Sequence, residues 1–216
     1  MSDSILIVGA TGLIGGLLAQ KIVANGNAKN LHILLRREAT TDFGEANIHV
    51  ADTDGWPEAI AAIKATVVIS CLGSTMKKAG SKEAFAAIDR DLVAAVAKAA
   101  KTAGARHFLS VSSTMANSKA SSFYLKVKGQ AEDALRAESF NRLDIIRPGL
   151  LRGERSNDWR LGEKLGIVAS PIMDNLLHGS MRRYRSIAAA DVASAMYALV
   201  GQSSEGEYVH ENDGLW

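Results

Sequence analysis

The chain has 216 residues, of which 47% are hydrophobic and 22% are charged, and its formal net charge is +2. This length suits a single hydrophobic core, and the composition excludes a disordered or fibrous protein. The nearly balanced charge creates no general field for nucleic acid, and no apolar run approaches the roughly 18 residues of a membrane-spanning helix. We therefore expect one soluble, cytoplasmic domain, a monomer or homodimer, with neither nucleic acid nor membrane as partner.

Short β-branched runs alternate with alanine-rich helical stretches, a pattern typical of repeated βαβ units. In chain order, we predict strands at residues 4–8, 31–35, 48–51, 67–71, 107–112, 143–147 and 206–210. Helices are predicted at residues 12–25, 57–64, 82–103, 122–138, 158–166 and 189–201. Right-handed crossovers then give an α/β Rossmann fold, a doubly wound and mostly parallel sheet of order 3-2-1-4-5-6 with a seventh strand and helices on both faces.

The least regular part of the sequence, residues 150–186, interrupts this alternation. Long connections without regular structure are uncommon in compact domains unless they serve a purpose. We therefore predict that this segment is either a lid over a substrate or a surface connection, within one domain that spans residues 1–216.

A glycine-rich turn joins the first strand to the first helix, and it consists of Gly9, Ala10, Thr11, Gly12, Leu13, Ile14 and Gly15. Between a strand and a helix, the first glycine permits a tight turn and the second lets the backbone approach a pyrophosphate. The third lets the helix pack close to the strand. Phosphates would bind the free N–H groups and the positive dipole end of the helix. The turn therefore predicts a dinucleotide-binding domain.

Arg36 and Arg37 end the second strand, at the position that sets the choice of dinucleotide. An acidic residue here would bind the ribose hydroxyls of NAD and repel a 2′-phosphate. A guanidinium group instead offers paired donors to that phosphate and can stack on adenine. We therefore expect NADP(H) in preference to NAD(H), although a solvated strand end is the alternative interpretation of the two arginines.

Two further strand ends are expected at the same site. Asp52, followed by Thr53, ends the third strand, where its carboxylate either accepts from the adenine amino group or caps the next helix. After the fourth strand, Gly73 lets the chain pass close to the dinucleotide. The stretch around it also contains Cys71, Leu72 and Ser74.

Cys71 is the only cysteine, so the chain has no internal disulfide or multi-cysteine zinc site. We therefore expect neither a metal nor a cysteine nucleophile.

Candidate catalytic residues follow the fifth strand. Tyr124 and Lys128 have the i,i+4 spacing that places them on one helix face. An ammonium group close to a phenol lowers the pKa of the phenol, which then exchanges a proton more easily during carbonyl reduction. Ser112 and Ser113 precede the pair, and a serine would hold the substrate oxygen. Without this context, the pair would fit a solvated lysine beside a half-buried tyrosine.

Together these motifs resemble the short-chain dehydrogenase/reductase superfamily, and within it the atypical branch of Tat-interacting-protein-like oxidoreductases. The resemblance covers roughly residues 1–155. It rests on residues 9–12, Arg36-Arg37, 71–75, 78–80, 89–91, 112–113, Tyr124 with Lys128-Gly129, and 147–151. It implies an NADP(H)-bound Rossmann fold in which Tyr124 donates a proton and Lys128 binds ribose and acidifies Tyr124. Asp89 stands where many members have an asparagine that supports a proton relay, so the relay is not carried over.

The resemblance also implies the remaining site residues. Ser113 is chosen over Ser112 for the substrate oxygen. Alternate strand residues point to opposite faces, so we expect only one of the two serines to reach the nicotinamide unless the strand has already ended. A turn after the sixth strand would lie under the nicotinamide carboxamide, or be only a rigid connection. This turn consists of Pro148, Gly149 and Leu150.

The leading function is hydride transfer between NADP(H) and a small carbonyl or alcohol substrate, with Tyr124 as proton donor or acceptor. A second class is an NADP(H)-binding regulatory or redox-sensing protein with little or no turnover, which the lack of a clear substrate domain favours. A sugar-nucleotide epimerase is a third, but it would need a larger C-terminal domain than the sequence provides.

Overall fold

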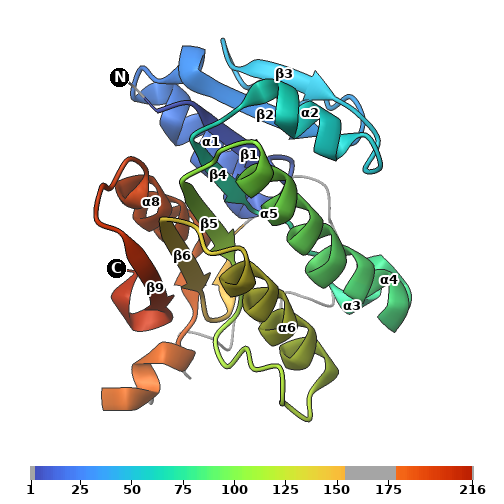
Figure 1. Cartoon of the computed structure of the whole chain (residues 1–216). Helices are drawn as coiled ribbons and strands as arrows, with labels where there is room; N and C mark the ends of the chain where they lie inside the picture. Colours follow the sequence, from blue (N-terminus) through green and yellow to red (C-terminus); the bar gives the residue numbers. More distant parts are fainter. Residues whose placement is uncertain (1–2, 154–178, 216) are drawn as a thin grey trace.

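The computed structural model describes residues 3–153 and 179–215, and a seven-stranded sheet forms its centre (Figure 1). The strands lie in the order β3-β2-β1-β4-β5-β6-β9, and all neighbouring pairs are parallel. Their bounds are Ile5–Val8 (β1), Leu31–Leu35 (β2), Asn47–Val50 (β3), Val67–Ser70 (β4), His107–Val111 (β5), Arg142–Arg147 (β6) and Gly206–Glu211 (β9). The predicted Rossmann fold and strand order are confirmed, and the seventh strand pairs with β6.

Helices cover both faces of the sheet (Figure 1). On one face lie α1 (Leu13–Ala24) and α8 (Ala189–Leu199), which contact each other. On the other face lie α2 (Trp56–Ile63), α5 (Val93–Thr102) and α6 (Phe123–Ala137). The central strands are therefore buried on both sides, which explains why their sequences are continuously apolar rather than alternating.

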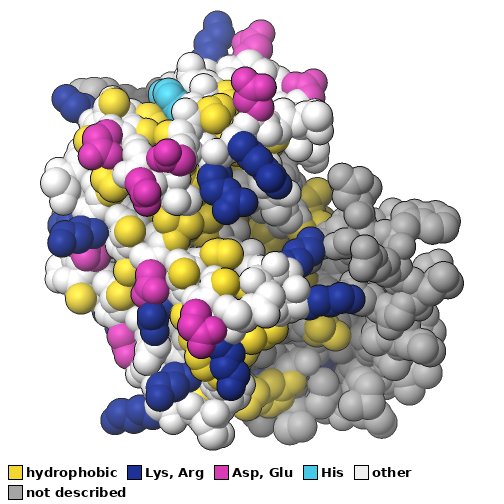
Figure 2. Space-filling model, turned by 90° about the vertical axis from the view of Figure 1, so that its right-hand side faces the viewer, with side chains coloured by type: hydrophobic (Ala, Val, Ile, Leu, Met, Phe, Trp, Pro, Cys, Tyr) yellow, Lys and Arg dark blue, Asp and Glu magenta, His cyan; other side chains and the backbone are white. Residues whose placement is uncertain are grey.

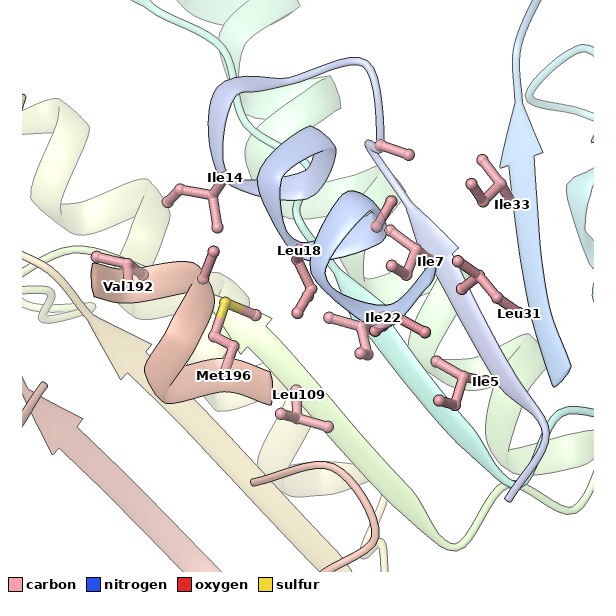
Figure 3. Packing of buried hydrophobic residues seen from close by; sticks show 14 of the residues in the cluster. Ile5, Ile7, Ile14, Leu18, Ile22, Leu31, Ile33, Leu109, Val192 and Met196 are labelled. Atoms are coloured by element: carbon pink, nitrogen blue, oxygen red, sulfur yellow. The ribbon is translucent and has the colours of Figure 1, made fainter. Parts of the chain in front are cut away.

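The core between the sheet and the first pair of helices holds α1 in place. Figure 3 shows side chains of α1 and α8 meeting over the sheet, among them Leu18 and Met196, both fully buried. In the sheet below, Ile7 lies between Ile33 and Ile69 of the neighbouring strands. Each such side chain contributes about 1.5–3 kcal/mol on burial. This packing fixes the start of α1 at the carboxyl end of β1.

The helix predicted at residues 82–103 is interrupted. It consists of α4 (Lys82–Ala86), a π-helical turn (η2, Ala87–Leu92) and α5. A π turn closes over i→i+5 instead of i→i+4, so it changes the direction of the side chains that follow it. Apolar periodicity did not predict the turn, because alanine-rich sequence continues on both sides. The turn carries Asp89, which is completely buried.

Several short elements were not predicted. α3 (Met76–Ala79) follows β4, and the hydroxyl of Thr75 accepts a hydrogen bond from the N–H of Lys78 at its start. β7 (Leu151–Arg152) and β8 (Ile187–Ala188) form a separate parallel pair. The 3-10 turns in the described part of the chain are Ala28–Asn30 (η1), Gly179–Tyr184 (η3) and Asn212–Gly214 (η4).

The central part of the irregular segment is not covered. The helix predicted at residues 158–166 and most of the segment at 150–186 lie outside the described residues. Across the described ranges, no helix combines the length and the apolar character needed to cross a membrane.

A buried cluster of charged side chains joins β5, β6 and β9. Asp144 accepts hydrogen bonds from Nε2 of His107 at 2.6 Å and from Nε2 of His210 at 2.7 Å. Arg142 donates to both oxygens of the same carboxylate, at 2.6 and 3.0 Å. Burial alone would raise the pKa of Asp144, but these hydrogen bonds outweigh burial and hold the pKa below its ordinary value. The cluster ties the edge strand β9 to the sheet.

Candidate functional site

The segments that follow β1, β2 and β4 surround a cavity of about 750 Å³. Figure 2 shows this side of the molecule, where Lys and Arg side chains gather around a hollow. The cavity is lined by Ala10, Thr11, Gly12, Leu13, Gly16, Leu17, Gln20, residues 35–41, Gly73, Ser74, Thr75 and Lys78. It therefore lies at the carboxyl edge of the sheet where the strand order reverses, the usual ligand position in this architecture.

The glycine-rich turn needs glycine for steric reasons. Gly9 has a φ of 82°, in the left-handed region that favours glycine. A Cβ atom at Gly9 would lie 2.6 Å from the carbonyl carbon of Cys71, at the end of β4. A Cβ atom at Gly15 would lie 2.4 Å from the carbonyl oxygen of Gly9. Only glycine at both positions lets the turn, the neighbouring strand and the helix approach this closely.

The first turn of α1 offers donors to an anion. Gly12 is the N-cap residue, and no side chain caps the helix. The backbone N–H groups of the first helical turn therefore have no side-chain acceptor. Gly12 and Leu13 both line the cavity, but the Gly12 N–H already donates to the carbonyl oxygen of Gly9 at 3.0 Å, so the available donors begin at Leu13. A phosphate in the cavity would accept from these N–H groups and lie at the positive end of the helix dipole. The residues of the turn therefore fit the diphosphate of a dinucleotide.

Basic side chains gather on the other walls of the cavity. Arg36 and Arg37 are exposed there, and neither forms a hydrogen bond or an ion pair with the described residues. Lys78 of α3 also lines the cavity, although sequence reasoning did not assign it to binding. The available signal was Thr75 three residues earlier, because a threonine at this spacing is typical of a helix start. Three cationic groups thus face the cavity, against the single carboxylate of Glu38.

Lys128 places a buried ammonium group beside the cavity. It lies on α6, one helical turn after Tyr124, and its side chain is only 7% exposed. Its Nζ atom is 2.7 Å from Oδ1 of Asp89, and Oδ2 of Asp89 accepts a hydrogen bond of 2.8 Å from the N–H of Ser74. A Cβ atom at Gly73 would lie 3.6 Å from Nζ. The lysine therefore reaches the back of the segment that lines the cavity.

Tyr124 is half-buried and held by an aromatic neighbour. Its ring centroid is 5.5 Å from that of Phe85, a completely buried residue of α4. None of the residues that the structure describes forms a hydrogen bond with the Tyr124 hydroxyl. The packing fixes the ring and leaves the hydroxyl able to bind a ligand.

The two serines after β5 have different environments. The Ser112 hydroxyl donates a hydrogen bond of 2.5 Å to Oε1 of Glu132, a buried carboxylate that also binds the Arg147 guanidinium. The hydrogen bond to Glu132 raises the pKa of Arg147 above its ordinary value. The Ser113 hydroxyl is half-buried and lies 3.3 Å from the carbonyl oxygen of Thr114.

The turn after β6 is fixed from two sides. The Thr114 N–H donates to the carbonyl oxygen of Pro148 at 3.1 Å. Asn212, fully buried at the start of η4, accepts from the Gly149 N–H at 2.8 Å and donates to the carbonyl oxygen of Arg185 at 2.9 Å. Sequence reasoning did not identify Asn212, because no local pattern connects residues 63 positions apart.

The structure brings some of the predicted site residues to the cavity and leaves others outside its lining. Those that line it are Ala10, Thr11, Gly12, Leu13, Arg36, Arg37, Gly73 and Ser74. Those outside the lining are Gly9, Ile14, Gly15, Asp52, Thr53, Cys71, Leu72, Ser113, Tyr124, Lys128, Pro148, Gly149 and Leu150.

Two of the residues outside the lining have other roles in the structure. Oδ1 of Asp52 accepts a hydrogen bond of 2.9 Å from the N–H of Gly55, the N-cap residue of α2. Burial raises the pKa of the Cys71 thiol to about 12, so this thiol stays protonated and is a poor nucleophile.

Comparison with known proteins agrees with this geometry. A sequence model described as NAD(P)H-binding matches residues 9–203. The chain belongs to this family. It is 36% identical to "Protein FMP52, mitochondrial" of Candida albicans over 169 residues, which is 75% of this chain and 73% of that protein. It is 34% identical to "Protein HTATIP2" of Rattus norvegicus over 168 residues, 76% of this chain and 69% of that protein. The resemblance to the atypical short-chain dehydrogenase/reductase branch is thereby confirmed.

Solved structures share the fold. The enzyme WbmH of Bordetella bronchiseptica in complex with NAD⁺ has a TM-score of 0.71 at 16% identity, over 97% of this chain and 75% of that chain. The dTDP-4-dehydrorhamnose reductase of Bacillus anthracis in complex with NADP has a TM-score of 0.64 at 16% identity, over 98% and 75%. This chain therefore shares the fold of these two dinucleotide-bound proteins, in agreement with the NAD(P)H-binding family to which it belongs.

The predicted cytoplasmic location is wrong. Several fungal relatives, including those of Lodderomyces elongisporus and Candida albicans, are named as mitochondrial proteins. The prediction rested on the composition, the balanced charge and the lack of a long apolar run, and none of these properties determines the compartment of a folded domain.

Proposed function

We propose that the chain is an NADP(H)-dependent oxidoreductase that interconverts a carbonyl compound and an alcohol. The observation that carries the proposal is the buried ammonium of Lys128, one helical turn from Tyr124 and behind the Gly73 segment that lines the cavity. A buried lysine next to a tyrosine whose hydroxyl has no hydrogen-bond partner in residues 3–153 and 179–215 suits proton transfer at the edge of a dinucleotide site.

Each side chain has a separate task in this proposal. Tyr124 donates its hydroxyl proton to the carbonyl oxygen during reduction and regains a proton from solvent. Ser113 donates a hydrogen bond to the same oxygen and so stabilises the negative charge that develops on it. Lys128, one helical turn from Tyr124, binds the ribose next to the nicotinamide. When bound, the reduced cofactor supplies the hydride.

The preference for NADP(H) rests on the basic walls of the cavity. Arg36 and Arg37 have no partners among the described residues, so a 2′-phosphate would not have to displace an internal ion pair. Guanidinium groups bind phosphate through paired, charge-assisted hydrogen bonds. Lys78 adds a third positive charge at the same cavity.

The central test compares Tyr124→Phe with the parent protein. Purified protein would be assayed for NADPH oxidation with a panel of aldehydes and ketones, and NADPH binding would be measured by fluorescence titration. We expect Tyr124→Phe to bind NADPH normally and to lose at least about 100-fold in kcat, the usual contribution of a general acid. Tyr208→Phe is the matched control, because the Tyr208 hydroxyl on β9 donates to the nearby Glu205 carbonyl oxygen and phenylalanine keeps the ring that packs on Arg142.

Two results would contradict the proposal. Full activity of Tyr124→Phe would remove this residue as the acid. A parent protein that binds NADPH but reduces no member of the panel would favour a regulatory or redox-sensing dinucleotide-binding protein instead.

A further inference from the structure

The ion pair between Asp89 and Lys128 is buried without an evident gain in stability. The Asp89 side chain is 0% exposed and the Lys128 side chain 7%. Removing two charges from water is costly, and the attraction between them often does no more than offset that cost. Well-packed apolar residues would stabilise this position equally well, so the pair needs another explanation.

The two oxygens of Asp89 bind different segments of the chain. Oδ1 lies 2.7 Å from Nζ of Lys128 on α6. Oδ2 accepts a hydrogen bond of 2.8 Å from the N–H of Ser74, which lines the cavity. The π turn that carries Asp89 directs it inward, whereas the next two residues, Arg90 and Asp91, pair with each other at 2.7 Å nearer the surface. Asp89 therefore links the turn η2, the wall segment and α6 at one point.

We propose that Asp89 is a positioning residue, which holds the Lys128 ammonium against the cavity wall so that its remaining N–H donors are directed at the ribose next to the nicotinamide. This inference rests on the proposed function and specifies how its lysine is held. An ammonium group has three donors, so an ion pair with one oxygen of Asp89 leaves donors for a ligand. A long lysine side chain that is ordered before binding loses little further rotamer freedom when the dinucleotide arrives, so the affinity is higher.

The test uses two ligands that differ at the nicotinamide end. Asp89→Asn keeps the shape of the side chain and can still accept from Ser74, but it removes the negative charge next to Lys128. We expect it to weaken NADPH binding about tenfold, the effect of one charge-assisted hydrogen bond. Binding of 2′,5′-ADP, which lacks the nicotinamide half, should change by less than about twofold. Asp91→Asn, on the same turn but at the surface, should leave both affinities unchanged.

A double-mutant cycle separates positioning from a merely structural role. In a Lys128→Met background, Asp89→Asn should not weaken NADPH binding further, because the residue acts through the lysine. The proposal is overturned if Asp89→Asn lowers the affinity for NADPH by the same factor in both backgrounds. It is equally overturned if Asp89→Asn lowers the affinities for NADPH and for 2′,5′-ADP by similar factors, which would indicate that the cavity wall has moved.

Folding of the variants provides an independent measurement. Each single variant leaves one buried charge without its partner, whereas Asp89→Asn with Lys128→Met contains neither charge. The double variant should therefore unfold at a higher temperature than Lys128→Met alone, and a lower temperature would overturn the pairing. A parent protein without affinity for NADPH would contradict the proposed function. A parent that binds NADPH, with Asp89→Asn binding equally well, would overturn only the role of Asp89.

Discussion

The hydroxyl of Ser112 donates a hydrogen bond of 2.5 Å to Oε1 of Glu132, which is 2% exposed. That carboxylate also accepts from Arg147 at 2.5 and 2.9 Å, so Ser112 belongs to a buried polar network. Ser113, the next residue, has no such partner among the described residues, and its nearest acceptor is the Thr114 carbonyl oxygen at 3.3 Å. Substitution of each serine should therefore have a different effect.

Ser113→Ala should lower activity, and Ser112→Ala should lower stability. Loss of one hydrogen-bond donor to a developing oxyanion costs about 100-fold in kcat. Loss of the Ser112 donor leaves a buried acceptor less well satisfied, which costs about 1–3 kcal/mol in the free energy of unfolding. Steady-state kinetics and urea unfolding of both variants measure the two effects. The reverse pattern would assign the catalytic hydroxyl to Ser112.

Replacing Arg36 and Arg37 together with Ala should abolish the preference for NADPH. We expect the affinity for NADPH to fall about 100-fold, because charge-assisted hydrogen bonds to the 2′-phosphate are lost. The affinity for NADH, which has no such phosphate, should stay within about twofold. Fluorescence titration with both nucleotides measures this, with Lys98→Ala on the exposed side of α5 as control. Equal affinities in the parent protein would contradict the role of the arginines.

Gly129→Ala should destabilise the protein and disturb the loop between β5 and α6. The added Cβ atom would lie 2.1 Å from the backbone N of Ser118 and 2.2 Å from the carbonyl carbon of Asn117. Overpacking of this kind costs about 1–3 kcal/mol. In a chain of this size, that corresponds to a fall of about 2–4 °C in Tm per kcal/mol. Gly214→Ala is the control, since its Cβ atom would meet nothing within 4 Å. Equal thermal stability of the two variants would contradict this contact.

Asp144→Asn should destabilise the protein at neutral pH and much less in acid. Hydrogen bonds from His107, His210 and Arg142 outweigh burial and lower the pKa of Asp144 in the folded state. The carboxylate therefore stabilises the fold at pH values above its ordinary pKa of about 3.9, and this contribution is lost as the pH falls further. We expect a difference of about 3–5 kcal/mol from the parent at pH 7, because the buried partners lose their counterion.

Urea unfolding of parent and Asp144→Asn between neutral and strongly acidic pH measures this dependence. The difference between the two proteins should shrink once the pH falls below about 4, where the carboxylate begins to protonate in the unfolded chain. A difference that stays the same across this range would contradict the role of the charge.

The fold and the dinucleotide edge of the site could be predicted because they depend on local patterns. The apolar run before Gly9 and the helix after it predict a strand, a turn and a helix, and right-handed crossovers then leave few possible strand orders. The structure confirms this order. Arg36 and Arg37 lie at the cavity because the end of β2 always adjoins the end of β1 in such a sheet.

Features that depend on packing over long distances could not be predicted. The π turn at Asp89 has no periodic signal, and the partner of Asp89 lies on another helix. Lys78 reaches the cavity only because the short helix α3 turns it there, and a stretch of four residues is too short for an apolar pattern. Within residues 150–186 the sequence predicted only the helix at 158–166, which lies outside the described residues.

Asn212 holds Gly149 although 63 positions separate them in the chain. Consider chimaeras assembled from two relatives with a crossover between these positions. The residues at positions 149 and 212 would then come from different parents, and they would have to be compatible with each other. A mismatched pair would disturb the Pro148 turn while the glycine-rich turn stayed intact. In recombination experiments, the last 3-10 turn of the described chain should therefore be inherited as a unit with β6.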